Sequence, residues 1–145
     1  MKKIRLGTIY LAKEMFERYL NPLADKYGVS VPSIEMLSIL HKSKQDTAKD
    51  MMDALGFSSS LTSFYISQLI DAGFIIKERD TSDKRIYHLI ITEAAQPIME
   101  DLEEYKNKFF GAVYNGVSKE DMEVHKNVMR IMADNIEEMI KGNWS

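Results

Sequence analysis

A change of hydrophobic period at Gly73 is the feature of this sequence that most constrains its fold. Before Gly73, apolar residues recur at helical spacing; after it come two short runs rich in β-branched residues, 74–76 and 86–91. The second run alternates between two faces, which carry Ile86, His88 and Ile90 and, opposite them, Tyr87, Leu89 and Ile91. A polar segment, 79–85, joins the runs. We therefore predict a β-hairpin over residues 74–91, directly after a helical region.

Two short helices are predicted just before this hairpin. The first begins after Thr47 or Asp46, either of which can cap it, and ends at Gly56. Ser58 can cap the second, which spans 58–72. Two short helices joined by a tight turn that contains glycine form a helix-turn-helix, and a hairpin directly after it is a wing.

Longer helices are predicted on both sides of this segment. The first covers 4–27, with Pro22 expected to kink or restart it, and Ser30 is expected to cap the next. After the hairpin, Thr92 is expected to cap a helix over 93–115. The fold class is therefore mainly α with a small β-hairpin (α+β).

The last predicted helix begins after Ser118, which forms a capping-box pattern with Asp121, and runs to about Lys141. Its inward stripe is predicted to contain Met122, Val128, Met132, Ile136 and Met139. The terminal helices carry apolar stripes broader than one small head can cover, and such stripes usually mark an interface.

The domain organisation follows from these stripes. Because twofold homodimers are the commonest oligomers, we predict that residues 4–20 and 105–140 form a dimer interface. We predict a winged head over 31–92, and a helical dimerisation region made of 1–30 and 93–145.

The helix over 58–72 has the character of a recognition helix, with one face expected to pack on the head and one face of short polar side chains. Hydroxyls there can bond phosphates or base edges, Phe64 can touch a thymine methyl, and Gln68 can pair with adenine. The face predicted to pack inward carries Leu61, Tyr65, Leu69 and Ala72, and the candidate DNA-binding residues of the helix are Ser58, Ser59, Ser60, Ser63, Phe64, Ser67 and Gln68. The alternative is that Ser58 only caps the helix and the other serines are solvated.

The hairpin tip carries the second candidate DNA contact. Arg85 can enter a minor groove, where narrow A·T stretches attract a cation, and Asp83 can hold its guanidinium from the same side of a strand. Lys77 and Lys84 are further candidate DNA-binding residues. The alternative is a solvated tip whose exposed ion pair contributes little.

Several stretches together resemble the MarR family of winged helix-turn-helix regulators. They are residues 55–60, 69–75, 79–85 and 89–93, and the Asp-x-Arg wing followed by a strand that ends in Thr-Glu is the most specific part. The resemblance implies an obligate dimer in which the first and last two helices interlock, with two winged heads straddling a palindrome. It also implies small, often aromatic or anionic, ligands that bind between the dimerisation region and the head and release DNA.

By this resemblance, Asp83 and Arg85 match the wing pair of the family, and Ser63 matches a Ser or Thr that commonly contacts DNA. The sequence departs from the family at Phe64, where Arg is frequent, and at Gln68, where a basic residue is common. Residues 58–72 contain no Lys or Arg at all. Fewer phosphate contacts predict a shallow salt dependence.

The ten methionines of the chain offer candidate ligand contacts, because methionine adapts its shape to what it packs against. Met15, Met36, Met99 and Met129 are candidates for an effector pocket, with ordinary core packing as the alternative for each. His41, His88 and His125 lie far apart without metal-ligand spacing, so we expect surface or boundary histidines, no metal site and no cofactor.

Composition excludes some functions and limits others. The net charge of −3 argues mildly against nucleic acid, but residues 74–88 carry four Lys or Arg against three Asp or Glu. The absence of cysteine excludes disulfides and thiol chemistry. No apolar run suggests a membrane span and no secretory signal is expected, so the predicted location is the cytoplasm.

The functional prediction is a homodimeric transcriptional regulator, acting as a repressor, that binds a palindromic double-stranded operator and responds to a small ligand. One alternative is a dimeric adaptor of the same fold that lost tight DNA binding. A remote alternative is a small hydrolytic enzyme with a nucleophile among Ser58–Ser63, although no histidine follows at a convincing position.

Overall fold

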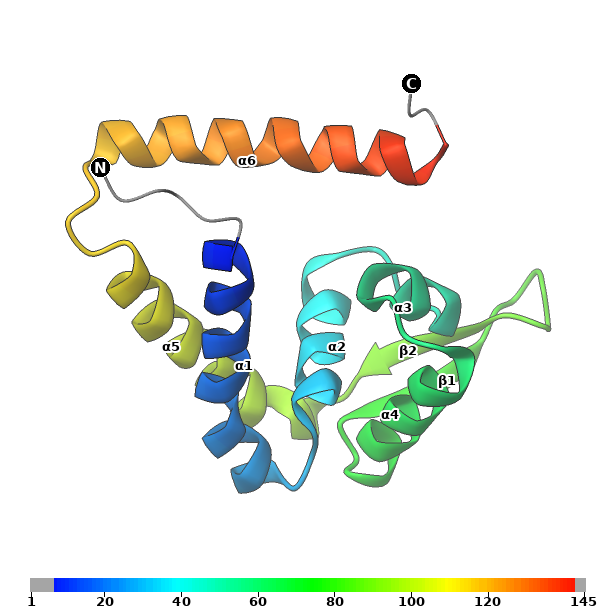
Figure 1. Cartoon of the computed structure of the whole chain (residues 1–145). Coiled ribbons are helices and arrows are strands. Elements are labelled where there is room, and N and C mark those ends of the chain that lie inside the picture. Colours follow the sequence, from blue (N-terminus) through cyan, green and yellow to red (C-terminus); the bar gives the residue numbers. More distant parts are fainter. Residues whose placement is uncertain (1–6, 143–145) are drawn as a thin grey trace. The chain divides into compact units, whose positions relative to one another are not determined.

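The computed structural model describes residues 7–142 of the chain and divides it into two compact units between Phe109 and Phe110. The first unit contains the helices and the hairpin of the head in the order shown in Figure 1. The elements of the two units together are α1 Gly7–Tyr27, α2 Val31–Lys42, α3 Ala48–Leu55, α4 Ser59–Asp71, β1 Ile75–Arg79, β2 Tyr87–Ile91, the 3-10 turn η1 Glu93–Ala95, α5 Gln96–Val113 and α6 Lys119–Ile140. Residues 4–6 of the predicted first helix, and the ends of the predicted dimerisation region at 1–6 and 143–145, lie outside the described residues.

Local sequence signals set the two helices of the helix-turn-helix. Thr47 caps α3 in a capping box, because its hydroxyl accepts from the backbone N–H of Asp50 while the Asp50 carboxylate accepts from the N–H of Thr47. Gly56 ends α3 in the left-handed conformation, with φ 68°, which glycine adopts without steric cost. Ser58 then caps α4 by accepting from the N–H of Leu61 at 3.2 Å. These three caps confirm the predicted helix-turn-helix.

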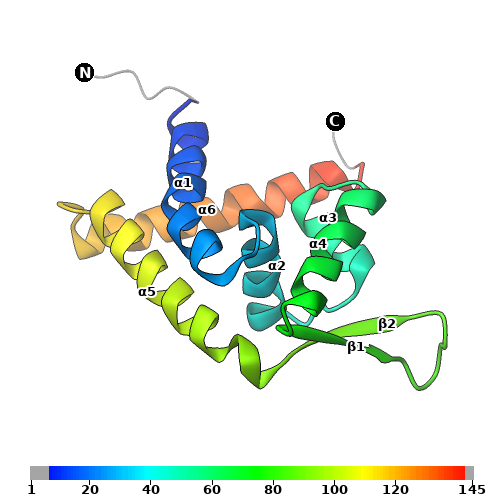
Figure 2. The same ribbon diagram turned by 90° about the horizontal axis from the view of Figure 1, so that it is seen from below.

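The wing is an antiparallel hairpin whose register places Ile75 opposite Ile91 and Arg79 opposite Tyr87. Its inner face is buried through Ile75 and Leu89. Seen from below, the hairpin extends beyond α3 and α4 (Figure 2). An isolated bridge between Thr47 and His88 also joins β2 to the start of α3, so the wing is tied to the helix-turn-helix by backbone as well as by side chains.

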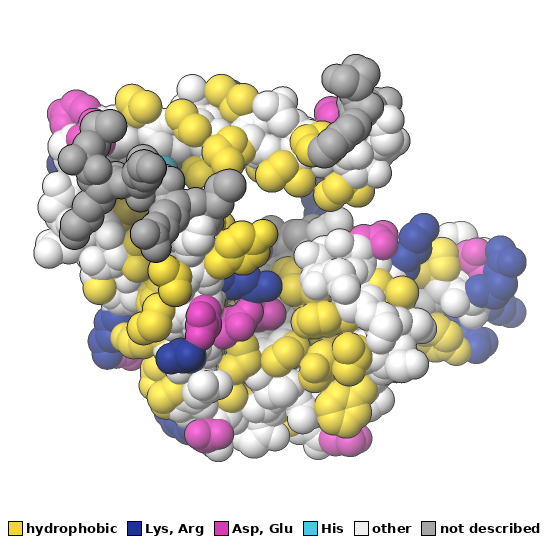
Figure 3. Space-filling view, viewed as in Figure 1, with side chains coloured by type: hydrophobic (Ala, Val, Ile, Leu, Met, Phe, Trp, Pro, Cys, Tyr) yellow, Lys and Arg dark blue, Asp and Glu magenta, His cyan; other side chains and the backbone are white. Residues whose placement is uncertain are grey.

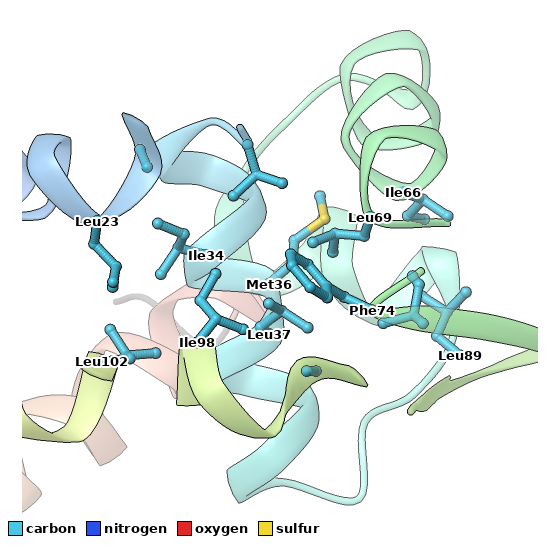
Figure 4. Packing of buried hydrophobic residues seen from close by; sticks show 14 of the residues in the cluster. Leu23, Ile34, Met36, Leu37, Ile66, Leu69, Phe74, Leu89, Ile98 and Leu102 are labelled. Carbon is cyan, nitrogen blue, oxygen red and sulfur yellow. The ribbon is translucent and has the colours of Figure 1, made fainter. Parts of the chain in front are cut away.

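The core of the first unit lies between the head helices and the ends of α1 and α5. Figure 4 shows Leu37 on α2 close to Ile98 of α5, and Met36 close to Leu69 and Phe74. The fully buried side chains include Leu20, Leu23, Ile34, Met36, Leu37, Met51, Leu69, Ile75, Ile98 and Leu102. On the side of α1, Asp101 of α5 accepts from Lys26 Nζ at 2.6 Å and from the Tyr27 hydroxyl at 2.8 Å. The core therefore joins residues far apart in the sequence.

Three details of the helix ends differ from the sequence-based expectation. Pro22 does not restart the helix, because α1 runs unbroken from Gly7 to Tyr27. Thr92 precedes the short turn η1 and not a long helix. Its side chain does not cap this turn, because its hydroxyl donates to the carbonyl of Gly73 at 2.6 Å. Ser30 precedes α2 without a side-chain cap. In the last two cases the side chain bonds to a residue distant in the sequence, Gly73 for Thr92 and Gln68 for Ser30, and does not cap the element that follows it.

The second unit contains the end of α5 and all of α6. Ser118 caps α6 by accepting from the N–H of Asp121 at 3.0 Å, as predicted. The Tyr114 hydroxyl and His125 Nε2 lie 3.0 Å apart across the turn between the helices. None of the residues 119–140 of α6 is buried in the single chain. Of the predicted inward stripe, Met122 is half-buried, and Val128, Met132, Ile136 and Met139 are exposed.

Candidate nucleic-acid interface

The polar face predicted for the recognition helix is present on α4. Ser59, Ser60, Ser63, Phe64 and Ser67 are all exposed. The buried stripe consists of Thr62, Ile66 and Leu69, at the four- and three-residue spacing of a helix face. The predicted inward position of Leu61 is wrong: it is 45 % exposed, because the helix packs on a stripe one residue further along. Leu61 therefore adds an apolar side chain to the exposed side.

Phe64 is the largest exposed side chain of this face, with 59 % of its surface accessible. Its ring packs edge-on against Tyr65, with ring centroids 5.4 Å apart, and Tyr65 in turn lies 5.4 Å from Phe57. This aromatic support restricts the Phe64 side chain while leaving its ring exposed to solvent. A thymine methyl is the group of a base pair that such a ring can contact.

From the sequence, Gln68 is predicted to pair with adenine. In the structure its side chain instead points into the head. Its Oε1 accepts from the N–H of Ser30 at 2.7 Å, from the Ser30 hydroxyl at 2.8 Å and from the Ser33 hydroxyl at 2.7 Å. The physical reason is that the N–H of Ser30 is a free donor at the start of α2, and this amide oxygen satisfies it. Gln68 therefore links α4 to the start of α2 through hydrogen bonds.

Asp83 and Arg85 form the predicted pair at the tip of the wing. Arg85 Nε lies 3.1 Å from Asp83 Oδ1, and the Arg85 backbone N–H donates to the same oxygen at 3.0 Å. Both residues belong to the loop between the strands and not to a strand, which corrects the sequence-based placement. The pairing with Arg85 holds the pKa of the Asp83 carboxyl below its usual value, while the Arg85 side chain remains 91 % exposed. The guanidinium is therefore oriented and still accessible.

Other cations lie on the same hairpin as this pair. Lys77 lies on β1 and Lys84 lies in the loop, both exposed, as predicted. Figure 3 shows Lys and Arg side chains gathered at the free end of the hairpin. Arg79, which the sequence did not single out, is held by its cross-strand partner Tyr87: Nη2 donates to the phenol oxygen at 2.6 Å, and the guanidinium lies 5.2 Å from the ring centre. Only the strand register could have indicated this contact.

His88 is the second residue that the sequence analysis missed, since it was expected to be an ordinary boundary histidine. Its Nδ1 lies 2.7 Å from Asp46 Oδ1, and its Nε2 lies 2.8 Å from Asp80 Oδ1. These hydrogen bonds, with Asp46 first and Asp80 second, raise the pKa of His88 to about 9. The pKa of Asp80 is lowered, first by His88 and then by the backbone N–H of Asp83. An alternating strand next to an Asp-rich tip is the only signal that pointed to this cluster.

The four candidate methionines do not gather around one cavity in the structure. Met36 is fully buried in the core of the head, and Met15 is exposed on α1. Met99 lines a small cavity between α2 and α5, and Met129 is exposed on α6 in the other unit. A larger cavity, of about 640 Å³, lies where α1 faces α2 and α3. Among residues 7–142, no methionine lines this larger cavity.

Other kinds of site were searched for in the part of the chain that the structure describes. No group of histidines and carboxylates within residues 7–142 could hold a metal ion. No helix in that range is both long and apolar enough to cross a membrane. Among the same residues, no hydrogen bond joins a serine of 58–63 to a histidine.

The arrangement of helix-turn-helix, hairpin and tip cation defines a winged helix-turn-helix protein. Residues 29–87 match the model of the MarR family. The fold is also that of a MarR transcriptional regulator from Methanosarcina mazei Go1, with a TM-score of 0.80, 19 % identity and coverage of 92 % of this chain and 96 % of the other. The chain is therefore similar to MarR regulators in its fold and, over residues 29–87, in its sequence.

Two further relatives show the range of similarity. The uncharacterized HTH-type transcriptional regulator YdgJ of Bacillus subtilis (strain 168) is 23 % identical over 75 % of this chain, and the match spans 66 % of that protein's length. BpsR of Bordetella bronchiseptica, whose DNA binding is regulated by 6-hydroxynicotinic acid, shares the fold with a TM-score of 0.68. It is 12 % identical over 88 % of this chain and 96 % of its own.

Proposed function

We propose that this protein is a homodimeric transcriptional repressor that binds a palindromic operator through α4 and the wing. The observation that carries the proposal is the exposed Arg85 guanidinium, which Asp83 holds in place at the end of the hairpin that follows α4. A cation presented in this way suits a narrow minor groove, while α4 suits the major groove next to it. In a symmetric dimer the two heads would contact half-sites about one helical turn apart, roughly 34–36 Å.

Sequence recognition in this proposal depends on few charges. The exposed face of α4 offers the hydroxyls of Ser59, Ser60, Ser63 and Ser67 and the ring of Phe64. Hydroxyls bond either phosphates or base edges, and an aromatic ring favours a thymine methyl. Lys77, Lys84, Arg79 and Arg85 of the wing supply the phosphate and minor-groove contacts. We therefore expect operators in which T·A pairs face α4 and an A·T stretch lies under each wing.

Selection from random duplex DNA with the purified full chain tests this function. The expected result is an enriched palindrome with half-sites about 10 base pairs apart. Arg85→Ala should abolish the enrichment. Lys141→Ala, which removes an exposed cation outside both the winged head and the predicted interface over 105–140, should leave it intact. A pool without enrichment for the wild type would contradict the proposal.

The adaptor alternative keeps one specific observation in its favour. The outer face of α4 carries no Lys or Arg and exposes two apolar side chains, Leu61 and Phe64, which also suit a protein partner. The same selection distinguishes the two functions, because an adaptor without specific DNA binding would enrich nothing.

Dimerisation is part of the proposal because α6 presents an apolar stripe that this chain does not cover. The stripe consists of Val124, Val128, Ile131, Met132, Ile136 and Met139, all of which are exposed. Stripes at this spacing bury themselves against other helices. A second copy of the chain supplies an identical stripe and a second DNA-binding head, which a palindrome requires.

A ligand response is proposed for the cavity between α1 and the helices α2 and α3. Its walls combine the ion pairs Lys13–Glu17 and Arg18–Glu14 with the apolar side chains Leu55 and Phe57, so an anion would bind by competing for these cations. Burial, and then the charge of Glu17, raise the pKa of Glu35 in the same wall. A small aromatic anion would meet both kinds of wall, as 6-hydroxynicotinic acid is a ligand of this type for BpsR. A ligand that favours another head position would shift the population away from DNA.

The ligand proposal is tested with a panel of hydroxylated aromatic carboxylates that includes 6-hydroxynicotinate. Each compound is titrated into the complex of protein and selected operator. We expect at least one to release the DNA, and Lys13→Ala or Arg18→Ala to weaken that response without changing the affinity for DNA alone. Release that persists unchanged in both variants would contradict the proposed cavity.

A further inference from the structure

His88 bridges two carboxylates that belong to different parts of the head. Nδ1 lies 2.7 Å from Asp46 Oδ1 and Nε2 lies 2.8 Å from Asp80 Oδ1. An ionised carboxylate only accepts hydrogen bonds, and a neutral imidazole has a single N–H. Both contacts are hydrogen bonds only if both ring nitrogens carry protons. The geometry itself therefore requires an imidazolium.

Each carboxylate is fixed to a different element. Asp46 lies in the turn before α3, and its backbone carbonyl accepts from the N–H of Leu89 on β2 at 2.7 Å. Asp80 begins the loop of the wing, and its second oxygen accepts from the N–H of Ser82 at 2.9 Å and from the N–H of Asp83 at 2.8 Å. The histidine thus connects the helix-turn-helix to the loop that holds Asp83.

A continuous series of contacts runs from this loop to the exposed guanidinium. The Asp83 backbone is held by Asp80, and the Asp83 carboxylate holds Arg85 through Nε and Nη2, both at 3.1 Å. Residues 81, 82, 84 and 85 of the tip are exposed, so packing against the core does not hold these side chains. Two backbone bonds also close the loop, from the N–H of Asp80 to the carbonyl of Ile86 and from the N–H of Ile86 to the carbonyl of Asp83, both at 3.0 Å. Order that the side-chain contacts add in the free protein need not be imposed when DNA binds, which favours affinity.

We propose that His88 is a positioning residue for DNA binding, whose doubly bonded imidazolium fixes the tip of the wing to the helix-turn-helix and so places Arg85. The inference rests on the proposed function, because it concerns how the wing meets DNA. It assigns a role to a partly exposed histidine that lies outside the hydrophobic core.

The surroundings of His88 favour the charged form. The anionic groups facing it are Asp46 from the turn before α3 and Asp80 from the loop, and its register partner on β1 is Glu78. The positive charge is consistent with the raised pKa of this histidine. Loss of the proton would leave a ring nitrogen lone pair facing one of the carboxylates, and that contact would open.

A double-mutant cycle separates positioning from simple stabilisation of the head. His88→Gln and Arg85→Ala are measured singly and together against the selected operator by fluorescence anisotropy. We expect His88→Gln to weaken binding about tenfold in the wild-type background and less than about twofold when Arg85 is already absent. His41→Gln, the same replacement at an exposed histidine of α2, is the matched control and should change nothing.

Order in the wing is read separately in the free protein. Backbone ¹⁵N heteronuclear NOE values for residues 80–86 should fall in His88→Gln, while those of α3 and α4 stay at wild-type values. A wild-type imidazole with both N–H protons detectable by NMR at pH 7 is also expected. Unchanged NOE values in the variant, or a single ring proton in the wild type, would overturn the inference.

The outcomes distinguish this inference from the proposed function. If the wild type enriches an operator and His88→Gln binds it equally well, or weakens binding equally with and without Arg85, the positioning role is wrong and the proposed function stands. If the wild type enriches nothing, the proposed function fails and the DNA role of His88 fails with it. The NOE values then still decide whether the histidine orders the wing.

Discussion

Arg85 and Asp83 form a two-point ion pair within the wing loop, with Nε 3.1 Å from one carboxylate oxygen and Nη2 3.1 Å from the other. Paired guanidinium and carboxylate groups of this geometry fix orientation as well as charge. Because the Arg85 side chain is 91 % exposed, the pair contributes little to folding stability. Its consequence is the direction in which the guanidinium points.

Asp83→Asn is expected to reduce the specificity of DNA binding more than its strength. The amide keeps the shape of Asp83 but cannot hold both guanidinium nitrogens as acceptors, so Arg85 becomes free to contact any phosphate. Removal of a negative charge also favours non-specific binding. The ratio of affinities for the selected operator and for random DNA should fall about tenfold, a figure typical of one lost specific contact.

The measurement is a pair of anisotropy titrations, on operator and on random duplex, at several salt concentrations. Arg85→Ala should lower the salt slope by about one unit, since one cation is removed. Asp83→Asn should leave the slope the same or make it steeper. An unchanged specificity ratio in Asp83→Asn would show that the ion pair does not direct Arg85.

Gln68→Ala is expected to destabilise the head rather than alter DNA recognition. The substitution leaves the N–H of Ser30 without its acceptor. It also removes the shortest bond of the buried Ser33 hydroxyl, which keeps only the Ser30 hydroxyl at 3.1 Å and the Tyr65 carbonyl at 3.5 Å. A buried donor without a partner costs about 1–3 kcal/mol. The free energy of unfolding, measured with urea, should fall by that amount.

Ser67→Ala is the matched control, because it lies next to Gln68 on α4 and is exposed. Its effect on the free energy of unfolding should stay within about 0.5 kcal/mol. If both variants were equally stable, the bonds of Gln68 to α2 would contribute nothing.

The stability that His88 adds should disappear at alkaline pH. Its pKa rises from an ordinary 6.5 to about 9 in the folded protein, first through Asp46 and then through Asp80. A raised folded-state pKa gives stability that is complete below the unfolded value, and that is lost as the pH rises through the folded value. The difference in unfolding free energy between wild type and His88→Gln should be largest near pH 6 and should close between 6.5 and about 9.

Urea unfolding of both proteins from pH 6 to pH 10 measures this difference, and groups that do not contact residue 88 cancel in the comparison. A gap that stays constant over the whole range would mean that His88 does not titrate in this window. The NMR titration of the imidazole gives the folded-state pKa directly.

Local rules were enough to predict most of the fold. The cap at Thr47, the helix end at Gly56 and the alternating strand after the wing loop depend on neighbours within a few residues. The pair of Asp83 and Arg85 is also local, since the residues are two apart. These features could be predicted because their partners lie within the same turn or loop.

The errors came from residues whose partners are distant in the sequence. Gln68 bonds to Ser30, 38 positions away, and His88 bonds to Asp46, 42 positions away. Leu61 was placed inward because α4 contains two overlapping apolar stripes, and packing selected the one through Ile66 and Leu69. A helical period cannot decide between stripes one residue apart. Only the surface against which the helix packs decides that.

Met132→Glu is expected to dissociate the proposed dimer. Met132 lies in the apolar stripe of α6 and is 39 % exposed in the single chain, so a charge there meets solvent in a monomer but would be buried in a dimer. Burial of an unpaired carboxylate costs several kcal/mol, which corresponds to a dissociation constant raised at least about a hundredfold.

Ala133→Glu is the matched control, because residue 133 is also exposed and follows Met132 by about 100° around the helix, away from the centre of the stripe. Light scattering over a range of protein concentrations gives the mass of each variant. We expect a dimer for the wild type and Ala133→Glu, and a monomer or an unfolded chain for Met132→Glu, with circular dichroism to tell these two apart. A wild-type monomer at low micromolar concentration, or a Met132→Glu dimer as tight as the wild type, would show that the stripe of α6 is not the dimer interface.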